Sequence, residues 1–161
     1  MEKTLHHPAE ATPNSLAKKC MPVSLVQLLL ERCDTSFDRL AIIDSLAGEQ
    51  LRWGQLLQQS VRVAERIEAA GLRPGDRVIH VGPHTAAWPI VDFACLLSSV
   101  VHVALHAEES QSELIRQLQL FQPCGLIFSG ENSLRHLSHS RLPLLEVRAD
   151  WRIKHVAYAT V

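Results

Sequence analysis

Short apolar segments alternate with helical segments over the middle of this chain, and this alternation constrains the fold more than any other feature. The runs Arg77–Val81, Val100–Leu105 and Gly125–Ser129 have the length and composition of buried strands. Between them, Ala86–Leu97 and the segment after Ser110 have helical character. Elements in this order build a parallel sheet with helices on its faces. We therefore predict an α/β fold with a doubly wound parallel sheet and flanking helices.

The helices of this region carry boundary signals. Thr85 is placed to cap the first helix, and Ser110 with Glu113 has the spacing of a capping box. The second helix is expected to pack through one apolar face: Leu114, Ile115, Leu118 and Phe121. Two further elements are expected beyond the third strand: a short helix near Asn132–Leu137 and a strand near Leu144–Val147.

The segment that precedes the alternation predicts a helix and a small hairpin. Ser24 and Gln27 have capping-box spacing, and an apolar stripe follows at helical intervals. That stripe consists of Leu25, Leu28, Leu29 and Cys33. A strand over Leu40–Asp44, a turn at Gly48 and a strand over Leu51–Trp53 form the predicted hairpin.

A long amphipathic helix links the hairpin to the sheet. Its apolar face is predicted to be Trp53, Leu56, Leu57, Val61, Ala64 and Ile67. Gly71 suits the left-handed position that closes such a helix, and Leu72 is the apolar residue that packs back. Residues 73–76 (Arg-Pro-Gly-Asp) then form a tight turn into the first strand of the sheet.

Composition excludes several classes of protein. The 161 residues are 47% hydrophobic and 20% charged, without the skew of disordered, collagen-like or coiled-coil chains. The formal charge of −1 supplies no field for nucleic acid or an anionic membrane. The apolar stretch Trp88–Leu105 is interrupted by polar residues and Pro89, so we predict a buried helix followed by a buried strand instead of a membrane span.

The N-terminal residues and the cysteines indicate the cellular compartment of the protein. Residues 1–22 hold three prolines and no apolar stretch, so we predict a mobile tail, with residues 23–161 as the folded part, and a cytoplasmic protein. The four cysteines are Cys20, Cys33, Cys95 and Cys124. They form no Cys-x-x-Cys pair, which excludes a zinc knuckle or a thioredoxin-type motif. Cys95 and Cys124 lie in apolar runs and are expected to be reduced and buried.

Residue patterns for nucleotide, metal or nucleophilic chemistry are incomplete. All seven glycines are isolated, so the nearest approach to a phosphate loop is Gly82–Thr85, which we interpret as a plain strand–helix turn. Ser129-Gly130-Glu131 follows a strand but is not a nucleophile elbow. Asp92 is the one charge in an apolar helix; a functional carboxylate and a residue that points to solvent or caps a neighbouring backbone both remain open, the latter favoured.

Nine histidines raise the question of a metal site. His80 and His84 are four residues apart, as are His102 and His106, but on a strand this spacing is roughly 13 Å, too far for one ion. His136 and His139 could lie on adjacent helical turns, yet no further ligand is evident. We therefore expect scattered surface or edge histidines, no metal site and no catalytic residue that the sequence identifies.

A resemblance to a known family rests on three motifs. They are Leu51-Arg52-Trp53-Gly54-Gln55-Leu56, then Val63-Ala64, then the corner from Ala70 to Val78, Ala-Gly-Leu-Arg-Pro-Gly-Asp-Arg-Val. With them, the segment Ser24–Ser129 resembles the N-terminal region of the acyl-adenylating enzymes: AMP-forming acyl-CoA synthetases, luciferases and nonribosomal-peptide adenylation domains. His84 stands where that family has asparagine, Ser99 where it has glycine and Ala104 where it has proline.

The resemblance implies an acyl-CoA synthetase-like ligase that activates a carboxylic acid, such as a fatty acid, with ATP, magnesium and coenzyme A. The family's phosphate loop and catalytic lysine have no counterpart among these residues, so it implies an N-terminal part, truncated or encoded as a short relative, that is inactive and holds no cofactor by itself. Two alternatives remain: an assembly module that pairs with itself or a partner polypeptide through exposed apolar surface, and a nucleotide binder that uses Gly82–Thr85.

Overall fold

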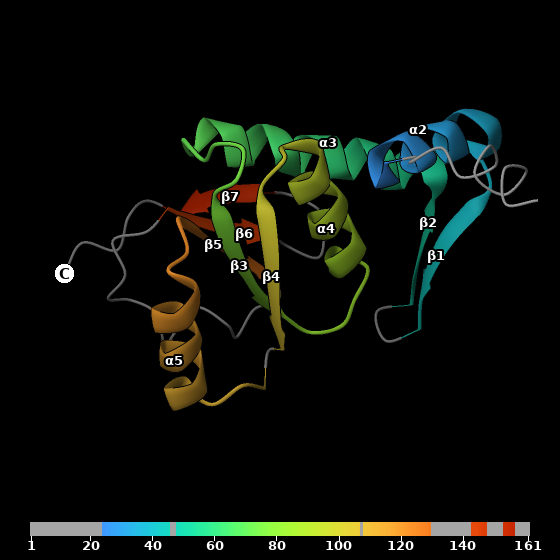
Figure 1. Cartoon of the computed structure of the whole chain (residues 1–161). Coiled ribbons are helices and arrows are strands. Elements are labelled where there is room, and N and C mark those ends of the chain that lie inside the picture. Colours follow the sequence, from blue (N-terminus) through green and yellow to red (C-terminus); the bar gives the residue numbers. More distant parts are fainter. Residues whose placement is uncertain (1–23, 46–47, 107, 130–142, 148–152, 157–161) are drawn as a thin grey trace, which may run out of the picture.

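A parallel sheet with helices on both faces forms the centre of the molecule (Figure 1). The computed structural model describes residues 24–45, 48–106, 108–129, 143–147 and 153–156. The strands are β3 (Arg77–Gly82), β4 (Val101–His106), β5 (Gly125–Ser129), β6 (Leu144–Val147) and β7 (Ile153–Val156). Their order is β4-β3-β5-β6-β7, parallel except for the antiparallel β6–β7 pair. The predicted doubly wound α/β architecture is confirmed, and β7 is an element that the sequence analysis did not predict.

The helices and the hairpin lie largely where the sequence places them. The helices are α2 (Leu25–Ser36), α3 (Trp53–Ala69), α4 (Ala87–Leu97) and α5 (Gln111–Phe121). Strands β1 (Leu40–Asp44) and β2 (Glu49–Arg52) form the antiparallel hairpin. The second hairpin strand was predicted too late, because Trp53 already begins α3. Figure 1 shows the hairpin lying apart from the central sheet, beyond α4.

Two caps illustrate how local chemistry sets helix starts. The Ser24 hydroxyl accepts a hydrogen bond from the Gln27 amide, and the Gln27 side chain accepts one from the Ser24 amide, each at 3.1 Å. This confirms the first capping box. Ser110 accepts from the Glu113 amide at 3.2 Å, but the Glu113 carboxylate accepts from Arg116 and Gln117 instead of completing a box.

The turns after α3 and α4 need left-handed backbone. Gly71 and Gly75 have φ values of +85° and +87°, as their predicted turn roles require. Ser99, after α4, has φ +55°. A glycine adopts this conformation more readily than a serine. The positive φ of residue 99 therefore explains why the family has a glycine at this position.

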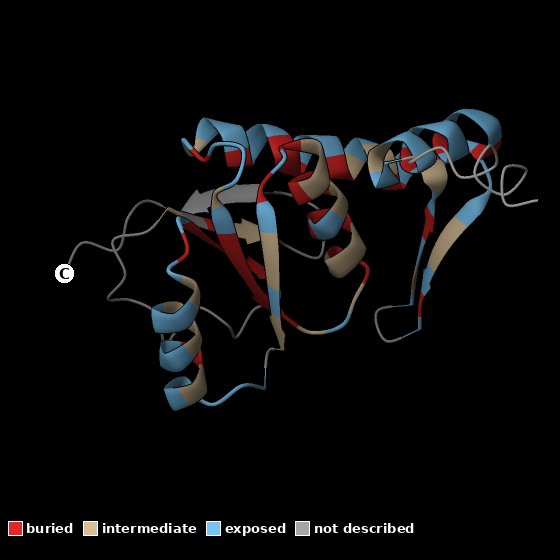
Figure 2. Ribbon diagram, viewed as in Figure 1, coloured by how far each residue is buried: buried red, intermediate tan, exposed pale blue. Residues whose placement is uncertain are grey.

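The core is divided between the two faces of the sheet. On one face, α3 and α4 pack over alternate residues of the strands, among them Val78, Ile127 and Leu145, and α2 extends this core by packing against α3 and α4. On the other face, α5 packs over the intervening residues, among them Ile79 and Phe128. We call these the α4 side and the α5 side. Figure 2 shows that α3 and α4 turn buried residues toward the sheet, whereas α5 is mostly exposed.

Several residues predicted as core are exposed. Leu25 and Leu28 on α2 are 61% and 49% exposed, so that helix packs through Leu29 and Cys33 alone of its predicted stripe. On α3, Val61 is exposed and Val63 is buried in its place. On α5, Ile115 is exposed. Helical spacing identifies which residues share a face but not how wide a stripe the neighbouring elements cover.

The predicted buried strand after α4 is also wrong in one respect. In the described part of the chain, β4 lies at the edge of the sheet and Val101 is exposed, because only β3 pairs with it. Within the same part of the chain, no helix is both long enough and apolar enough to cross a bilayer. The predicted mobile tail of residues 1–22 and the predicted helix near Asn132–Leu137 lie outside the described residues.

Candidate functional site

The carboxyl ends of β3, β4 and β5 lie at one edge of the sheet, because these strands are parallel and adjacent. Ligands of open α/β sheets bind outside this edge. The edge carries Gly82 at the end of β3, His106 at the end of β4 and Ser129 at the end of β5. A ligand-binding or catalytic site is therefore expected at this edge.

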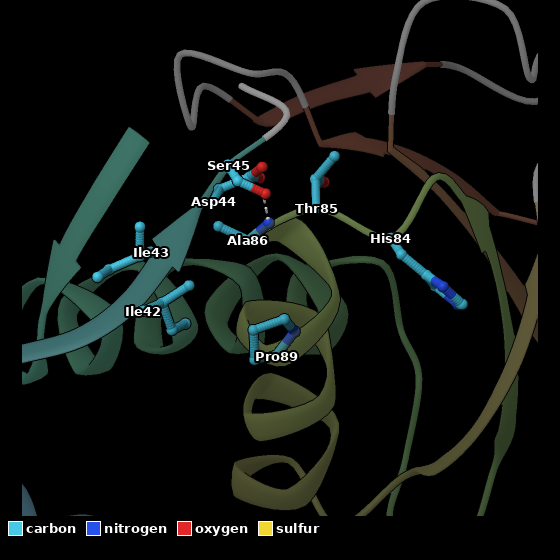
Figure 3. Close-up of a pocket in the computed structure, with 8 residues that line it drawn as sticks. All are labelled: Ile42, Ile43, Asp44, Ser45, His84, Thr85, Ala86 and Pro89. Carbon is cyan, nitrogen blue, oxygen red and sulfur yellow. Dashed lines mark hydrogen bonds between the residues drawn. The ribbon is translucent and has the colours of Figure 1, made fainter. Parts of the chain in front are cut away.

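A pocket of about 230 Å³ lies between the end of β1 and the start of α4, next to this edge (Figure 3). It is lined by Ile42, Ile43, Asp44, Ser45, His84, Thr85, Ala86 and Pro89. The Gly82–Thr85 turn contributes His84 and Thr85 to this lining. Figure 3 shows the His84 ring directed away from Asp44, so the acidic and imidazole groups do not converge.

Asp44 occupies the position that an anionic ligand would need. Its buried carboxylate accepts a hydrogen bond from the Ala86 amide at 2.8 Å (Figure 3). A carboxylate at the start of a helix is stabilised by the exposed amides and the helix dipole. Thr85, the predicted cap, only accepts from the Ala87 amide at 3.4 Å. The described residues of the lining include no lysine or arginine, so these residues do not fit the phosphate groups of ATP.

Four side chains on the α4 side form a hydrogen-bonded series: Asp92, His102, His80 and Ser129. We call it the histidine row. Asp92 Oδ1 lies 2.8 Å from His102 Nδ1, and His102 Nε2 lies 3.3 Å from His80 Nδ1. His80 Nε2 lies 2.9 Å from Ser129 Oγ. This series joins α4, β4, β3 and β5 and was not predicted from the sequence.

Burial changes along the histidine row. The Asp92 side chain is 57% exposed and that of His102 is 11% exposed, whereas His80 is 0% and Ser129 is 2% exposed as whole residues. Burial, with a smaller contribution from His102, lowers the pKa of His80 to about 3. His80 is therefore neutral at physiological pH. The row connects the surface to the interior.

The expectation of scattered surface or edge histidines was wrong for His80. Neighbouring parallel strands bring together residues on the same face, so His80 meets His102 and His84 meets His106. His84 and His106 are in edge contact, with ring centroids 4.7 Å apart, and His84 contacts the Trp88 ring in the same way. The usable signal was the common separation of 22 residues between both pairs, across two predicted strands, instead of the four-residue spacing within one strand.

Ser129 reaches His80 because Gly82 leaves room. A Cβ atom at Gly82 would lie 1.9 Å from Ser129 Oγ and 2.8 Å from the Ser129 carbonyl oxygen. Any side chain at residue 82 would thus displace the serine. Gly130, Glu131, His136 and His139 lie outside the described residues. Asp92 is exposed, as favoured, and its carboxylate accepts a hydrogen bond from the His102 ring.

Metal and thiol chemistry have little support at this edge. Over the described ranges, no three His, Cys, Asp or Glu side chains are grouped so that they could hold a metal ion. Cys95 is buried as predicted, and burial, with a smaller effect of Asp92, raises its pKa to about 12. Burial also raises the pKa of Cys33. Cys124, predicted to be buried, is exposed.

Comparisons with known proteins point in one direction. The family model described as "AMP-binding enzyme" matches residues 29–158. A feruloyl-CoA synthase of Amycolatopsis sp is 37% identical over 67 residues, which is 42% of this chain and 14% of that protein. A rice (Oryza sativa subsp. japonica) 4-coumarate–CoA ligase-like protein is 20% identical over 126 residues, which is 78% of this chain and 22% of that protein.

Solved structures show the same fold. O-succinylbenzoate coenzyme A synthetase of Bacillus subtilis, in complex with ATP and a magnesium ion, superposes with a TM-score of 0.66 at 22% identity. The match covers 79% of this chain and 36% of that chain. This chain thus spans well under half of the length of the proteins to which it is similar.

Proposed function

This chain belongs to the AMP-binding enzyme family, and on that premise we propose that it forms the N-terminal part of an acyl-CoA synthetase-like ligase. The complete ligase would activate a carboxylic acid with ATP and transfer the acyl group to coenzyme A. The observation that carries the proposal is the family match over residues 29–158, in a chain whose match to the feruloyl-CoA synthase covers only 14% of that protein.

In this proposal the chain has no ligase activity by itself. The edge pocket supports this, because Asp44 already pairs with the Ala86 amide and the lining residues that the structure describes include no lysine or arginine for phosphate. Magnesium has no grouped carboxylates within the part of the chain that the structure describes. ATP, magnesium and coenzyme A therefore enter the proposal as ligands of the complete family domain. They are not assigned to residues of this chain.

ATP–pyrophosphate exchange tests the proposal. The 161-residue protein would be assayed with a panel of fatty, benzoic and hydroxycinnamic acids, with the Amycolatopsis feruloyl-CoA synthase as the positive control. We expect acid-dependent exchange from the control and none above background from this protein. Exchange that requires both this protein and an added acid would overturn the inactivity. A titration with ATP, AMP and coenzyme A would separately test a nucleotide-binding role for Gly82–Thr85.

A second candidate function is assembly, and the exposed apolar residues of the N-terminal segment favour it. Leu25, Leu28, Leu30, Phe37, Leu40 and Ile43 are all exposed, on α2, β1 and the link between them. We call this set the apolar arm. Exposed apolar surface of this kind is typical of interaction sites. Because the relatives are several times longer, the occupant that we propose is another segment of the AMP-binding domain, supplied as separate polypeptide.

Mixing experiments distinguish assembly from a free-standing chain. The protein would be combined with a feruloyl-CoA synthase from which the 67 matched residues are deleted, and the mixture analysed by light scattering after size exclusion. We expect a 1:1 complex that Ile43→Ser weakens and Val61→Ser, an exposed control outside the apolar arm, leaves unchanged. A monomer in every mixture would contradict the proposal, as would self-association alone.

The proposal also places the protein in the cytoplasm. The cysteines Cys33, Cys95 and Cys124 are free thiols. Buried reduced thiols such as Cys33 and Cys95 are typical of proteins in reducing compartments. Thiol labelling of the protein in cell extracts under non-reducing conditions would test this, with three reactive groups expected after unfolding in addition to Cys20.

A further inference from the structure

The histidine row has a geometry in which proton positions on one member dictate those on the next. His80 and His102 have ring centroids 5.4 Å apart and planes inclined by 25°. Their nearest nitrogens are 3.3 Å apart, so the two rings meet edge to edge, as an N–H···N hydrogen bond requires. Each imidazole uses both of its nitrogens within the row. A neutral imidazole has one donor nitrogen and one acceptor nitrogen.

The Asp92 carboxylate sets the direction of the neutral row. An ionised carboxylate only accepts hydrogen bonds, so His102 Nδ1–H donates to Asp92 and His102 Nε2 is an acceptor. His80 must then donate from Nδ1, which leaves its Nε2 as an acceptor. The Ser129 hydroxyl therefore donates to His80 Nε2. In this state Ser129 presents only lone pairs to any other group.

We propose that the histidine row is a proton relay in which protonation of His102, near the surface, reverses the hydrogen bond between His80 and the Ser129 hydroxyl. This inference goes beyond the proposed ligase function and does not depend on it. Asp92, His102 and His80 act as positioning residues. Ser129 is the group that they control.

The protonated row contains one proton more than the neutral row. An imidazolium donates from both nitrogens, so His102 keeps Nδ1–H toward Asp92 and gains Nε2–H toward His80. His80 then accepts at Nδ1 and carries its single proton on Nε2, from which it donates to Ser129 Oγ. Ser129 retains a hydroxyl proton that is free to donate elsewhere. The count rises from three exchangeable protons to four.

The surroundings leave His102 as the member that takes up the proton. Burial holds the pKa of His80 at about 3, so His80 stays neutral through the mildly acidic range. On α4, the neutral Trp88 ring contacts His80, and the thiol of Cys95, whose pKa is raised to about 12, lies near Asp92. At the strand ends, the His84 and His106 rings contact each other, and the His84 ring also contacts the Trp88 ring. Asp92 is the anionic partner that stabilises an imidazolium at His102.

The consequence is a hydroxyl group whose polarity depends on pH. Ser129 lies at the carboxyl end of β5, fixed against Gly82. When His102 is neutral, Ser129 can accept a further hydrogen bond but cannot donate one. When His102 is protonated, Ser129 can donate to an acceptor such as a carbonyl or carboxylate oxygen.

NMR of the imidazole nitrogens tests this directly. In the ¹⁵N-histidine-labelled 161-residue protein, long-range ¹H–¹⁵N spectra would identify the tautomer of His80 over pH 8 to pH 5, with its signals assigned by comparison with His80→Gln. We expect the Nδ1–H tautomer at high pH and the Nε2–H tautomer once His102 has titrated. A Nε2–H tautomer at pH 8 would overturn the proposal, and so would one tautomer throughout the titration of His102.

Variants separate the driving group from the responding group. His102→Gln should hold His80 in a single tautomer at all pH values, whereas Ser129→Ala should leave the pH-dependent change in place. Asp92→Asn keeps a hydrogen-bond acceptor but removes the charge that favours an imidazolium, so the change should move to lower pH. If a variant does not fold, the titration of the unmodified protein still decides. Identical titrations of the unmodified protein and Asp92→Asn would contradict the role of Asp92.

Discussion

The two sides of the central sheet are built on the same strands but have different cores. On β3, Val78 and His80 face α4, whereas Ile79 and Val81 face α5. The α4 side is covered by α3 and α4, with α2 packed against them, and it holds the buried end of the histidine row together with its apolar residues. The α5 side is covered by one helix in the described residues, and that helix is mostly exposed (Figure 2). Its buried residue is Leu114. Burial depends on how many elements cover a face, and the polar row lies on the better covered one.

The largest effect is expected on the α4 side. Ile90 on α4 is 0% exposed within that core. Ile90→Ala should reduce the free energy of unfolding by about 4 kcal/mol, because removal of buried methyl groups leaves a cavity in a well-packed region. Urea unfolding followed by circular dichroism would measure it, with the exposed Leu120→Ala as control. A loss below about 1.5 kcal/mol would mean that the α4 side is not the tighter core.

Low pH should destabilise the α4 side through His80. Its pKa is about 3 in the folded protein and about 6.5 for an ordinary histidine in the unfolded chain. The unfolded state therefore takes up a proton that the folded state refuses, so His80 adds its full share of stability above about pH 6.5 and loses it as pH falls toward about 3. At pH 4.5 the loss is on the order of 2–3 kcal/mol.

The comparison with His80→Gln isolates this effect from other acid-sensitive groups. The unfolding free energy of the unmodified protein should fall more steeply between pH 6.5 and pH 4.5 than that of the variant. If the unfolding free energies of the two proteins fell equally with pH, His80 would be protonated in the folded protein. Water would then reach the α4 side in spite of its burial.

The α5 side should be less sensitive to truncation. Leu114 is the buried anchor of α5, and Leu114→Ala should reduce the unfolding free energy by about 2 kcal/mol, the lower end of the range for such a change. The matched control is Ile115→Ala, one residue further along the same helix but exposed, with an expected change under about 0.5 kcal/mol. If Leu114→Ala were as costly as Ile90→Ala, the two sides would be equally well packed.

Elements with strong local signals were predictable from sequence. The capping pair Ser24–Gln27, the left-handed glycines Gly71 and Gly75 and the apolar run Gly125–Ser129 are each determined by residues within a few positions. Hydrophobic period, caps and turn residues act locally, so they identify elements. The family resemblance, now shown by the match over residues 29–158, rests on the same local segments.

Residues whose environment depends on distant neighbours were not predictable in this way. Leu25 and Ile115 have helical spacing of core residues, yet no neighbour covers them and they are exposed. Cys124 lies in an apolar run but at its exposed start. Thr85 is a reasonable cap by sequence, but Asp44, 42 residues away from Ala86, takes the helix amide instead. The burial and the hydrogen-bond partners of these residues depend on which helices and strands pack against one another.

By itself, the sequence determined the class of fold, the order of helices and strands and the resemblance to the AMP-binding enzymes, because these follow from local period and from short motifs. Tertiary structure alone decided that Asp92, His102, His80 and Ser129 form one hydrogen-bonded row. Four different elements supply these side chains. Their meeting depends on strand order, on register and on the space that Gly82 leaves, and no local pattern in the chain specifies those three together.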